Sequence, residues 1–304
     1  MPFKIPTFIT TKIIYLFAFF VFLAILSLTI INIKTSDPPS ESPPPTVQVS
    51  QAPKVPKVTK NPKVETIVKN AQNLSGKYVI YIKDLRTQNT YGLNSAEVFG
   101  AASVYKLAVM YATYDAIENG KLKKNTLLSG EKMNPDQPTP TQTETVSYSV
   151  QEALRLMITI SDNNAAILLS EKLGWADIDK FMEAEGFSEI NLVGANSPNL
   201  TARSTGALLE KIYKKEAVNK KYSEEMINLL MSQKVNDRIP KYLPANIKVA
   251  HKTGELETIR NDAGIVYGKK GTYIFVFLSD TKNPLDAAEQ IATLSKKIFD
   301  ELEK

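Results

Sequence analysis

The sequence contains no cysteine and a single histidine, His251, among its 304 residues. The lack of cysteine excludes disulfides, thiolate metal sites, cysteine nucleophiles and a lipid-modified cysteine. One histidine without cysteine does not make a zinc site, and we expect neither a metal nor a cofactor. There is no Gly-x-Ser-x-Gly string, and a Ser-His-Asp triad would need His251 as its base. A serine nucleophile in this chain is therefore expected to use a lysine as its base.

The sequence also has little concentrated charge. Its net charge is +5, and the lysines are spread along the chain with no basic helix and no run of Lys or Arg interleaved with aromatic residues. Such a distribution is typical of a solvated surface. We therefore expect no nucleic-acid partner.

One long apolar run stands near the start of the chain. Residues 13–33 are 21 residues without a charge, and a membrane-spanning helix needs about 20. Lys4 and Lys12 precede the run, which predicts a cytoplasmic tail at 1–12 and an extracytoplasmic domain after a single-pass anchor in the cell membrane. A cleaved signal peptide is the alternative, but the run is longer than its apolar region and offers no small-x-small site. Residues 34–62 contain eight prolines and are expected to form a semi-rigid linker.

The remaining residues, 63–304, are expected to form one domain of the α/β (α+β) class. Strand patterns occur at 78–85, 90–93, 247–252, 263–267 and 272–278, with a helical pattern over 101–242 and a last helix from Asn283-Pro284. This order predicts an antiparallel five-stranded sheet from both termini, flanked by helices, with an inserted all-helical subdomain. The α/β part would comprise 63–100 and 245–304, and the helical part 101–244. A cleft between the two parts is the expected place for a site.

The pattern Ser-x-x-Lys occurs three times, beginning at Ser103, Ser129 and Ser279. Only Ser103 begins an apolar helical segment whose single charge is Lys106, one turn further on. Burial of an ammonium lowers its pKa, and this is how a lysine becomes able to take a proton from a serine. The alternative interpretation is a helix-capping serine followed by a lysine that reaches solvent.

Two further strings carry polar groups of the right kind. Ser161-Asp-Asn163 precedes a predicted helix, and by itself it is most often a helix-start signal. Lys252-Thr-Gly254 ends a predicted strand, where a cation, a hydroxyl and a glycine could bind a carboxylate close to the backbone. Either string alone can arise by chance.

Taken in order, the Ser103 pair, the Ser-Asp-Asn string and the Lys-Thr-Gly string resemble the superfamily of class A β-lactamases and penicillin-binding proteins. The resemblance covers about residues 65–304. It includes Arg260-Asn-Asp-Ala-Gly-Ile265 after the Lys-Thr-Gly string and Thr201-Ala-Arg-Ser204 before a helix. It implies a β-lactamase-like serine hydrolase that forms an acyl-enzyme on β-lactam or D-alanyl amide bonds.

The resemblance also implies a role for each matching residue. Ser103 would be the nucleophile, Lys106 its base, and Ser161 the group that passes a proton to the leaving nitrogen. The substrate-binding residues would be Asn163 for the amide side chain, Lys252 and Thr253 for the carboxylate, with Gly254 beside them and Arg260 assisting. The backbone N–H groups of Ser103 and Glu255 would form the oxyanion hole. Asp162 is expected to support its loop, and His251 to point to the face opposite Lys252.

The sequence departs from the class A pattern at the glutamate that activates the deacylating water. No Glu-x-x-Leu-Asn string lies between Asn163 and Lys252; Glu189-Ile-Asn-Leu192 is followed by Val193 instead. Acylation is therefore expected, whereas efficient deacylation is not.

Three functions remain open at this point. The first is a β-lactamase-type hydrolase that is slow to release its acyl group. The second is a D-Ala-D-Ala carboxypeptidase or related peptidoglycan hydrolase, which would act on stem peptides beyond the proline-rich spacer. The third is a non-catalytic domain that binds the wall or senses β-lactams.

Overall fold

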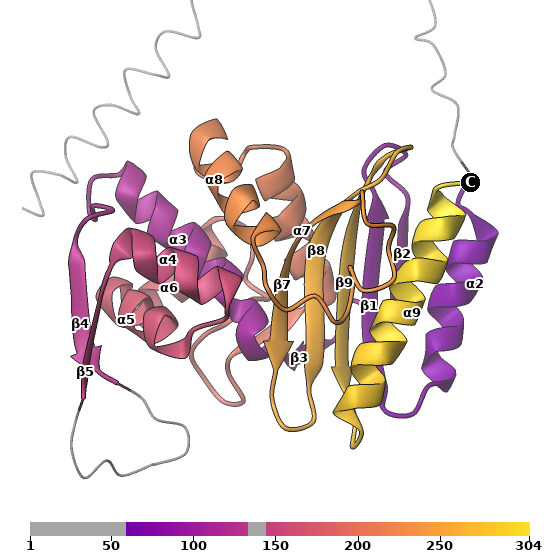
Figure 1. The fold of residues 1–304 in the computed structure, drawn as a ribbon, viewed down its shortest axis with the longest axis horizontal. Coiled ribbons are helices and arrows are strands. Elements are labelled where there is room, and N and C mark those ends of the chain that lie inside the picture. Colours follow the sequence, from indigo (N-terminus) through magenta and orange to yellow (C-terminus); the bar gives the residue numbers. More distant parts are fainter. Residues whose placement is uncertain (1–58, 133–143) are drawn as a thin grey trace, which may run out of the picture. The chain divides into compact units, whose positions relative to one another are not determined.

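The computed structural model describes residues 59–132 and 144–304 (Figure 1). The predicted tail and anchor, and most of the predicted linker, lie outside the described residues. Within the described ranges, no helix is both long enough and apolar enough to cross a membrane. The first described helix, α2 (Pro62–Asn70), begins at the last proline of the predicted linker. Asn61 caps it by accepting a hydrogen bond from the Lys63 amide, and proline suits the first helical position because its missing N–H would have had no partner there.

The core of the fold is an antiparallel five-stranded sheet with the order β2-β1-β9-β8-β7. Its strands are β1 (Lys77–Asp84), β2 (Thr90–Leu93), β7 (Lys248–Glu255), β8 (Arg260–Tyr267) and β9 (Thr272–Asp280). The predicted sheet from both ends of the domain is therefore confirmed. It forms because β-branched and aromatic residues dominate these segments and suit a pleated, buried surface.

Helices cover both faces of this sheet. Ile80 and Ile82 of β1 pack in the apolar cluster that includes α2 and α9 (Pro284–Leu302), whereas Val79 and Tyr81 belong to the cluster on the opposite face. This alternation follows from the two-residue period of a strand. Figure 1 shows α2 and α9 side by side on one side of the sheet and the other helices on the opposite side.

Helix α7 (Ala202–Tyr213) of the helical part packs on β1, β8 and β9 of the sheet. A Cβ at Gly206 would lie 2.4 Å from the ring of Tyr81, so a glycine is needed where the helix crosses β1. The other helices of this part are α3 (Lys106–Glu118), α4 (Val150–Thr159), α5 (Asn163–Leu173), α6 (Trp175–Ala184) and α8 (Lys220–Met231). Two short 3-10 helices, η1 (Ala71–Asn73) and η2 (Ala102–Tyr105), precede β1 and α3.

The prediction of an all-helical subdomain over 101–244 was wrong. This part contains a hairpin of β4 (Leu127–Glu131) and β5 (Thr145–Ser149), and β6 (Asn199–Thr201) pairs with β3 (Val98–Gly100). These strands are short and largely polar, so their alternation gave no apolar period to detect. The pairing of β3 with β6 joins segments about a hundred residues apart, which local patterns cannot reveal.

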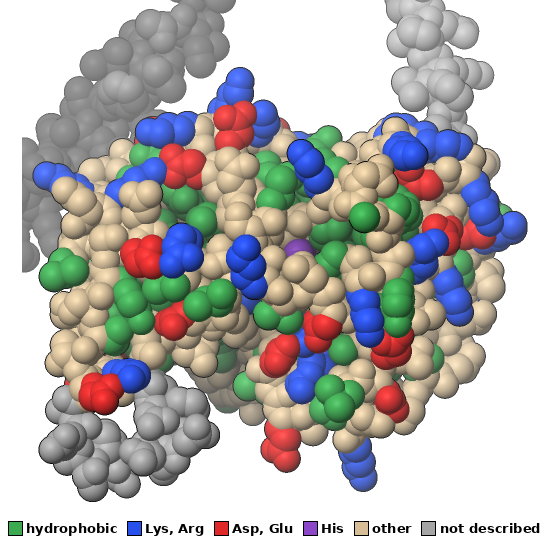
Figure 2. All heavy atoms as spheres, in the orientation of Figure 1, with side chains coloured by type: hydrophobic (Ala, Val, Ile, Leu, Met, Phe, Trp, Pro, Cys, Tyr) green, Lys and Arg blue, Asp and Glu red, His purple; other side chains and the backbone are tan. Residues whose placement is uncertain are grey.

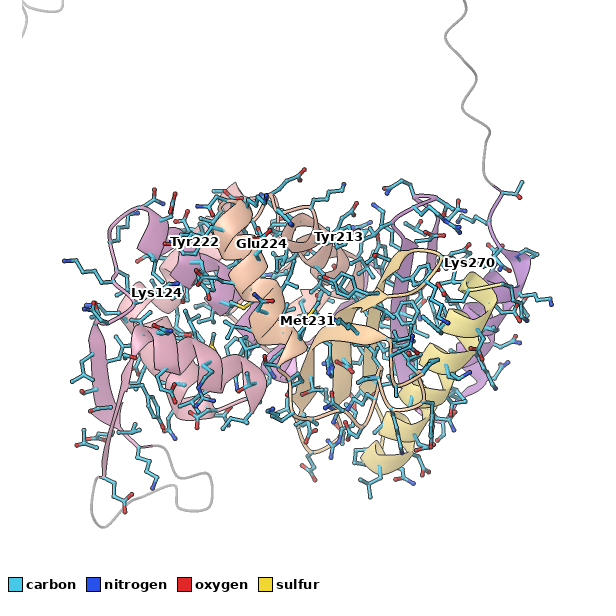
Figure 3. The ribbon with its side chains drawn as sticks, turned by 45° about the horizontal axis from the view of Figure 1, so that its top comes forward. Lys124, Tyr213, Tyr222, Glu224, Met231 and Lys270 are labelled. Atoms are coloured by element: carbon cyan, nitrogen blue, oxygen red, sulfur yellow. The ribbon has the colours of Figure 1, made fainter. Side chains whose placement is uncertain are left out.

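Charged side chains of both signs are spread over the face shown in Figure 2. Many form ion pairs between neighbouring elements. Lys124 after α3, for example, pairs with Glu225 of α8, and its ammonium lies 5.4 Å from the ring centre of Tyr222. Figure 3 shows Lys124 and Tyr222 on the same side of the helical part. Exposed pairs of this kind each contribute about 0–1 kcal/mol and mainly keep the surface soluble.

A buried asparagine ties the helical part to the sheet. Asn261 of β8 donates its Nδ2 to the carbonyls of Gly100 (2.9 Å) and Ala101 (3.1 Å), and its Oδ1 accepts the Ser279 amide (3.0 Å). The side chain is fully buried. The chain segment that enters η2 is therefore fixed to two strands of the sheet.

Replacing this asparagine by leucine would leave the Ser279 amide and the Gly100 carbonyl without this partner in the interior, whereas the Ala101 carbonyl would keep its hydrogen bond from the Val104 amide. Each buried group left unpaired costs about 1–3 kcal/mol. We expect Asn261→Leu to lower the free energy of unfolding by at least about 2 kcal/mol in urea. Asn228→Leu, on the exposed face of α8, is the matched control and should change it by less than about 0.5 kcal/mol. Equal effects of the two changes would contradict this account.

Candidate active site

The candidate nucleophile lies where the chain passes from β3 into α3. Ser103 is half-buried in η2, and the residue before it, Ala102, adopts a φ of 43°. Lys106 is the first residue of α3 and is completely buried. Since nearly every side chain of α3 is buried as well, the helix runs through the middle of the helical part. The Lys106 side chain is therefore removed from bulk water along its whole length.

The three hydrogen bonds of the Lys106 ammonium all go to uncharged oxygen atoms. Its Nζ donates to the Ser161 carbonyl (2.7 Å), the Ser161 hydroxyl (3.2 Å) and Asn163 Oδ1 (2.7 Å). Burial lowers the pKa of Lys106 to about 8, although the negative charge of Asp162 opposes the shift. Near neutral pH a larger fraction of this lysine is therefore unprotonated than of a lysine on the surface.

The Ser-Asp-Asn string forms the corner between α4 and α5. Ser161 adopts a φ of 60°, which costs about 1–3 kcal/mol for a residue with a side chain. Asp162 caps α5, because its Oδ1 accepts the Ala165 amide at 2.7 Å. These contacts agree with the expected supporting role of Asp162. They also direct both Ser161 and Asn163 toward Lys106.

A second buried lysine reaches the same serine from the sheet. Lys252 is completely buried in β7, and its Nζ donates to the Ser161 hydroxyl (2.9 Å) and to the Thr253 carbonyl (2.8 Å). Burial lowers the pKa of Lys252 well below its ordinary value, and the nearby charge of Lys106 lowers it further. The two ammonium groups repel each other, and the Ser161 hydroxyl lies between them as a shared hydrogen-bond acceptor.

The Lys-Thr-Gly string lies inside a strand rather than at its end, because β7 continues to Glu255. A Cβ at Gly254 would lie 3.1 Å from the Ser103 backbone nitrogen and equally close to the Ala101 carbonyl oxygen. Glycine therefore lets β7 pass directly beside the turn that carries Ser103. This brings the two backbone segments named for the oxyanion hole next to each other.

The residues that follow the Lys-Thr-Gly string have side-chain partners of their own. Burial alone would raise the pKa of Glu255, but the hydrogen bond and charge of Arg238 lower it. Arg260 donates its Nη1 to the carbonyls of Leu256 (2.6 Å) and Ile259 (2.8 Å). In this arrangement the Arg260 guanidinium holds the turn between β7 and β8.

Arg238 is the residue of this region that sequence reasoning missed. Its side chain is completely buried and contacts the carboxylates of Glu255 and Asp237. In the described part of the chain, its Nε and Nη1 have no hydrogen-bond partner. The charge of Arg238 also acts on Lys252. The available sequence signal was a lone arginine in a loop segment before the Lys-Thr-Gly strand, which is too weak to select it.

Glu189 lies apart from this group of residues. Its Oε2 accepts the Thr201 hydroxyl and its Oε1 accepts Arg203 Nη2, both at 2.7 Å. These contacts lower the pKa of Glu189, and the hydrogen bond from Thr201 has the largest effect. Partial burial opposes the shift. A carboxylate held in this way is a weak base, and it faces the start of α7 rather than Lys106.

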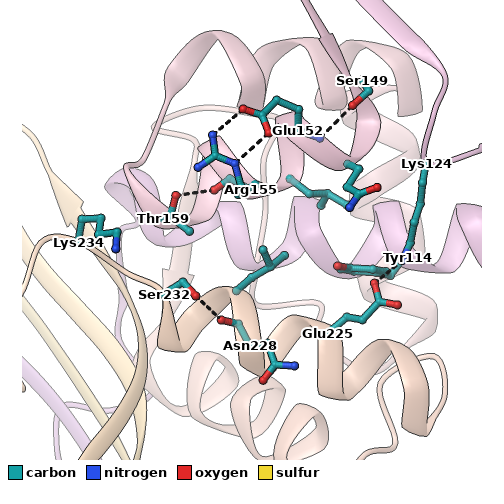
Figure 4. Close-up of a pocket in the computed structure, with 13 residues that line it drawn as sticks. Tyr114, Lys124, Ser149, Glu152, Arg155, Thr159, Glu225, Asn228, Ser232 and Lys234 are labelled. Carbon is teal, nitrogen blue, oxygen red and sulfur yellow. Dashed lines mark hydrogen bonds and ion pairs between the residues drawn. The ribbon is translucent and has the colours of Figure 1, made fainter.

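The structure thus brings Lys106, Ser161, Asn163 and Lys252 into one hydrogen-bonded group, and it places Gly254 against the Ser103 turn. Arg260 and Glu189 are not part of this group. A separate cavity of about 540 Å³ lies between α4 and α8 (Figure 4) and is lined by none of the predicted site residues. At one end of this cavity the Lys234 amide donates to the Thr159 carbonyl at 2.9 Å.

Comparison with known proteins supports a β-lactamase-like domain. Residues 61–302 match the model of the Beta-lactamase enzyme family. Beta-lactamase SME-1 of Serratia marcescens is 22% identical over 248 residues, which cover 76% of this chain and 84% of the relative. Beta-lactamase BRO-1 of Moraxella catarrhalis is 28% identical over 181 residues, which cover 51% of this chain and 56% of the relative.

Solved structures share the fold at low sequence identity. PBP-A superposes with a TM-score of 0.72 at 22% identity, covering 80% of this chain and 96% of that chain. A mutant of PBP-A in an acyl-enzyme complex with penicillin G gives a TM-score of 0.70 at 22% identity, with the same coverage of both chains. A class A β-lactamase from Bacteroides cellulosilyticus gives 0.69 at 22% identity, covering 80% and 98% of the two chains. With its family match over most of the sequence, this chain belongs to the Beta-lactamase enzyme family.

Proposed function

We propose that this protein is a serine hydrolase in which Ser103 opens β-lactam or D-alanyl amide bonds and becomes acylated. The observation that carries the proposal is the pair of buried lysines that share the Ser161 hydroxyl beside the Ser103 turn. A buried lysine with a pKa of about 8 is a base that an ordinary surface lysine cannot be.

In the proposed acylation step, neutral Lys106 takes the proton of the Ser103 hydroxyl as the serine oxygen bonds to the carbonyl carbon. When the C–N bond breaks, the Ser161 hydroxyl gives its proton to the leaving nitrogen. Ser161 then recovers a proton from Lys106, to which it is already hydrogen-bonded. The lysine ends the step neutral, and the proton of Ser103 has moved to the leaving group.

The groups around this proton path would bind the two charged parts of the reacting substrate. The backbone N–H groups of Ser103 and Glu255 would stabilise the oxyanion, which the close approach of Gly254 to the Ser103 turn supports. Lys252 and Arg238 would provide positive charge for a substrate carboxylate. Both cations are buried and have little contact with water, so a substrate carboxylate would give them a charged hydrogen-bond partner.

A D-alanyl peptidase is the second candidate, and the contacts of Glu189 favour it. Release of the acyl group by water usually requires a carboxylate near the acylated serine, and Glu189 is bound to Thr201 and Arg203 instead. The predicted anchor at 13–33 and the linker at 34–62 would hold such an enzyme outside the cell membrane, near peptidoglycan.

Replacing Ser103 by alanine should abolish covalent labelling by a fluorescent penicillin, because the nucleophilic oxygen is lost. Gel fluorescence and intact-protein mass spectrometry would measure the labelling. Ser129→Ala is the matched control, since Ser129 begins the same Ser-x-x-Lys pattern but pairs with Ser147 in the β4–β5 hairpin. Labelling that persists in Ser103→Ala would overturn the assignment. A wild-type protein without any adduct would favour the non-catalytic binding domain.

The acylation rate should depend on pH through Lys106. Burial lowers the pKa of this lysine to about 8, and only its neutral form can accept a proton. The rate constant of acylation should therefore rise about tenfold per pH unit below this value and level off above it. Lys106→Arg should be nearly inactive at every pH because a guanidinium stays protonated. A flat profile from about pH 6 to pH 9 in stopped-flow labelling would exclude Lys106 as the base.

Hydrolysis of a chromogenic cephalosporin should begin with a stoichiometric burst and continue at a much slower steady rate. The loss of a positioned base for water costs about 10²–10⁴-fold, so the acyl-enzyme should accumulate. Glu189→Gln should leave the steady rate nearly unchanged. A linear progress curve at high turnover that Glu189→Gln abolishes would show efficient deacylation by that residue and an ordinary β-lactamase.

A further inference from the structure

The single histidine of the chain has no role in the proposed chemistry, yet it is almost completely buried. His251 is 1% exposed, and Figure 2 shows only a small area of it on the surface. It lies in β7 next to Lys252, but its contacts are with β8 and with the loop segment between α8 and β7. As expected from the alternation along a strand, its hydrogen-bond partners differ from those of Lys252, although the charge of Asp262 also acts on Lys252.

Both ring nitrogens of His251 face oxygen atoms. Nδ1 lies 2.9 Å from Asp262 Oδ1, and Nε2 lies 3.0 Å from Asn236 Oδ1. The orientation of Asn236 follows from its other contacts, because its Nδ2 faces the carbonyls of Gln233 (3.4 Å) and Lys234 (3.5 Å). Since carbonyl oxygens only accept, the oxygen of the Asn236 amide must face the ring. The ring thus lies between the Asp262 carboxylate and the Asn236 amide oxygen, within hydrogen-bond distance of both.

The same aspartate holds the backbone on the other side of Arg238. Asp262 is completely buried, and its Oδ2 accepts the Ile239 amide at 3.0 Å. Asn236 and Ile239 thus flank Arg238, one two residues before it and the other one residue after it. The His251–Asp262 pair fixes both of them to the sheet.

Arg238 needs such support because its own contacts are few. The carboxylates that it touches belong to Glu255 and Asp237, whose side chains are 49% and 51% exposed. Its Nε and Nη1 have no hydrogen-bond partner in the described ranges. Solvent around these half-exposed carboxylates screens their attraction for the buried guanidinium. The position of this charge therefore also depends on the backbone that carries it.

We propose that His251 is a positioning residue for substrate specificity, which acts by holding residues 236–239 so that the Arg238 charge stays beside Lys252. The inference rests on the proposed function in one respect, namely that the substrate carries a carboxylate next to the reacting amide. We call the contacts of His251 with Asp262 and Asn236 the clamp. Loss of the clamp would weaken the preference for substrates that carry this carboxylate, and it would leave Ser103 and Lys106 in place.

The experiment measures this preference as the ratio of dissociation constants for penicillin G methyl ester and penicillin G. Binding is measured in a Ser103→Ala background, so that covalent chemistry does not contribute. Asn236→Ala is the main variant because Asn236 is exposed and the change should not impair folding. His251→Leu removes the whole clamp. Val235→Ala, a neutral truncation of the adjacent residue, is the matched control.

We expect the preference for penicillin G over its ester to fall about tenfold in Asn236→Ala and at least as far in His251→Leu, because a displacement of about 1 Å can cost up to about 10²-fold. Binding of the ester should stay within about twofold of the parent protein, and Val235→Ala should keep the preference. If Asn236→Ala weakened the binding of penicillin G and of its methyl ester equally, or left the ratio of their dissociation constants unchanged, the proposal would be overturned. The absence of any preference in the parent protein would also overturn it.

A failure of the proposed function would look different. It would appear as a lack of acylation by penicillin G in the protein with Ser103 intact. The binding ratio in the Ser103→Ala background would still decide whether His251 positions Arg238.

Discussion

The hydroxyl of Ser161 accepts hydrogen bonds from two completely buried ammonium groups, and the arrangement of the site depends on this contact. A buried charge without partners is so costly that the group changes its protonation or the fold changes around it. Here Lys106 and Lys252 are surrounded by the oxygens of Ser161, Asn163 and Thr253. Their pKa values are lowered by this burial.

This contact also decides how the helical part meets the sheet. Lys106 begins α3, Ser161 forms the corner between α4 and α5, and Lys252 belongs to β7. The three elements must therefore converge on one oxygen atom. Gly254 and Asn261 complete the arrangement, because the first lets β7 approach the Ser103 turn and the second fixes the chain just before that turn. A strained backbone at Ser161 is tolerated because elements on both sides hold it.

The sequence predicted those features that rest on local patterns or on motifs. The strands of the sheet are rich in β-branched and aromatic residues, the last helix has a clear apolar period, and the ordered strings placed Ser161 and Lys252 near Lys106. The sequence could not reveal Asn261 or Arg238 as structural partners, because their contacts join residues that are far apart in the chain. No local pattern distinguishes them from the other asparagines and arginines. The β4–β5 hairpin was not predicted for another reason, since its strands are polar and lack regularly spaced apolar residues. The continuation of β7 past Lys252 depends on its pairing with β8, which is a long-range property.

The hydrogen bonds that hold the serine turn have a consequence for synthesis of the chain. Asn261 and the carbonyls of Gly100 and Ala101 are separated by 161 and 160 positions, and Lys252 and Ser161 by 91. Contacts between such distant positions form late in folding, because a long loop must close first. A growing chain contains Ser103 long before it contains β7 and β8, and until those strands pair the serine lies in a turn without its supports. The reactive centre is thus completed only after β7 and β8 have been made.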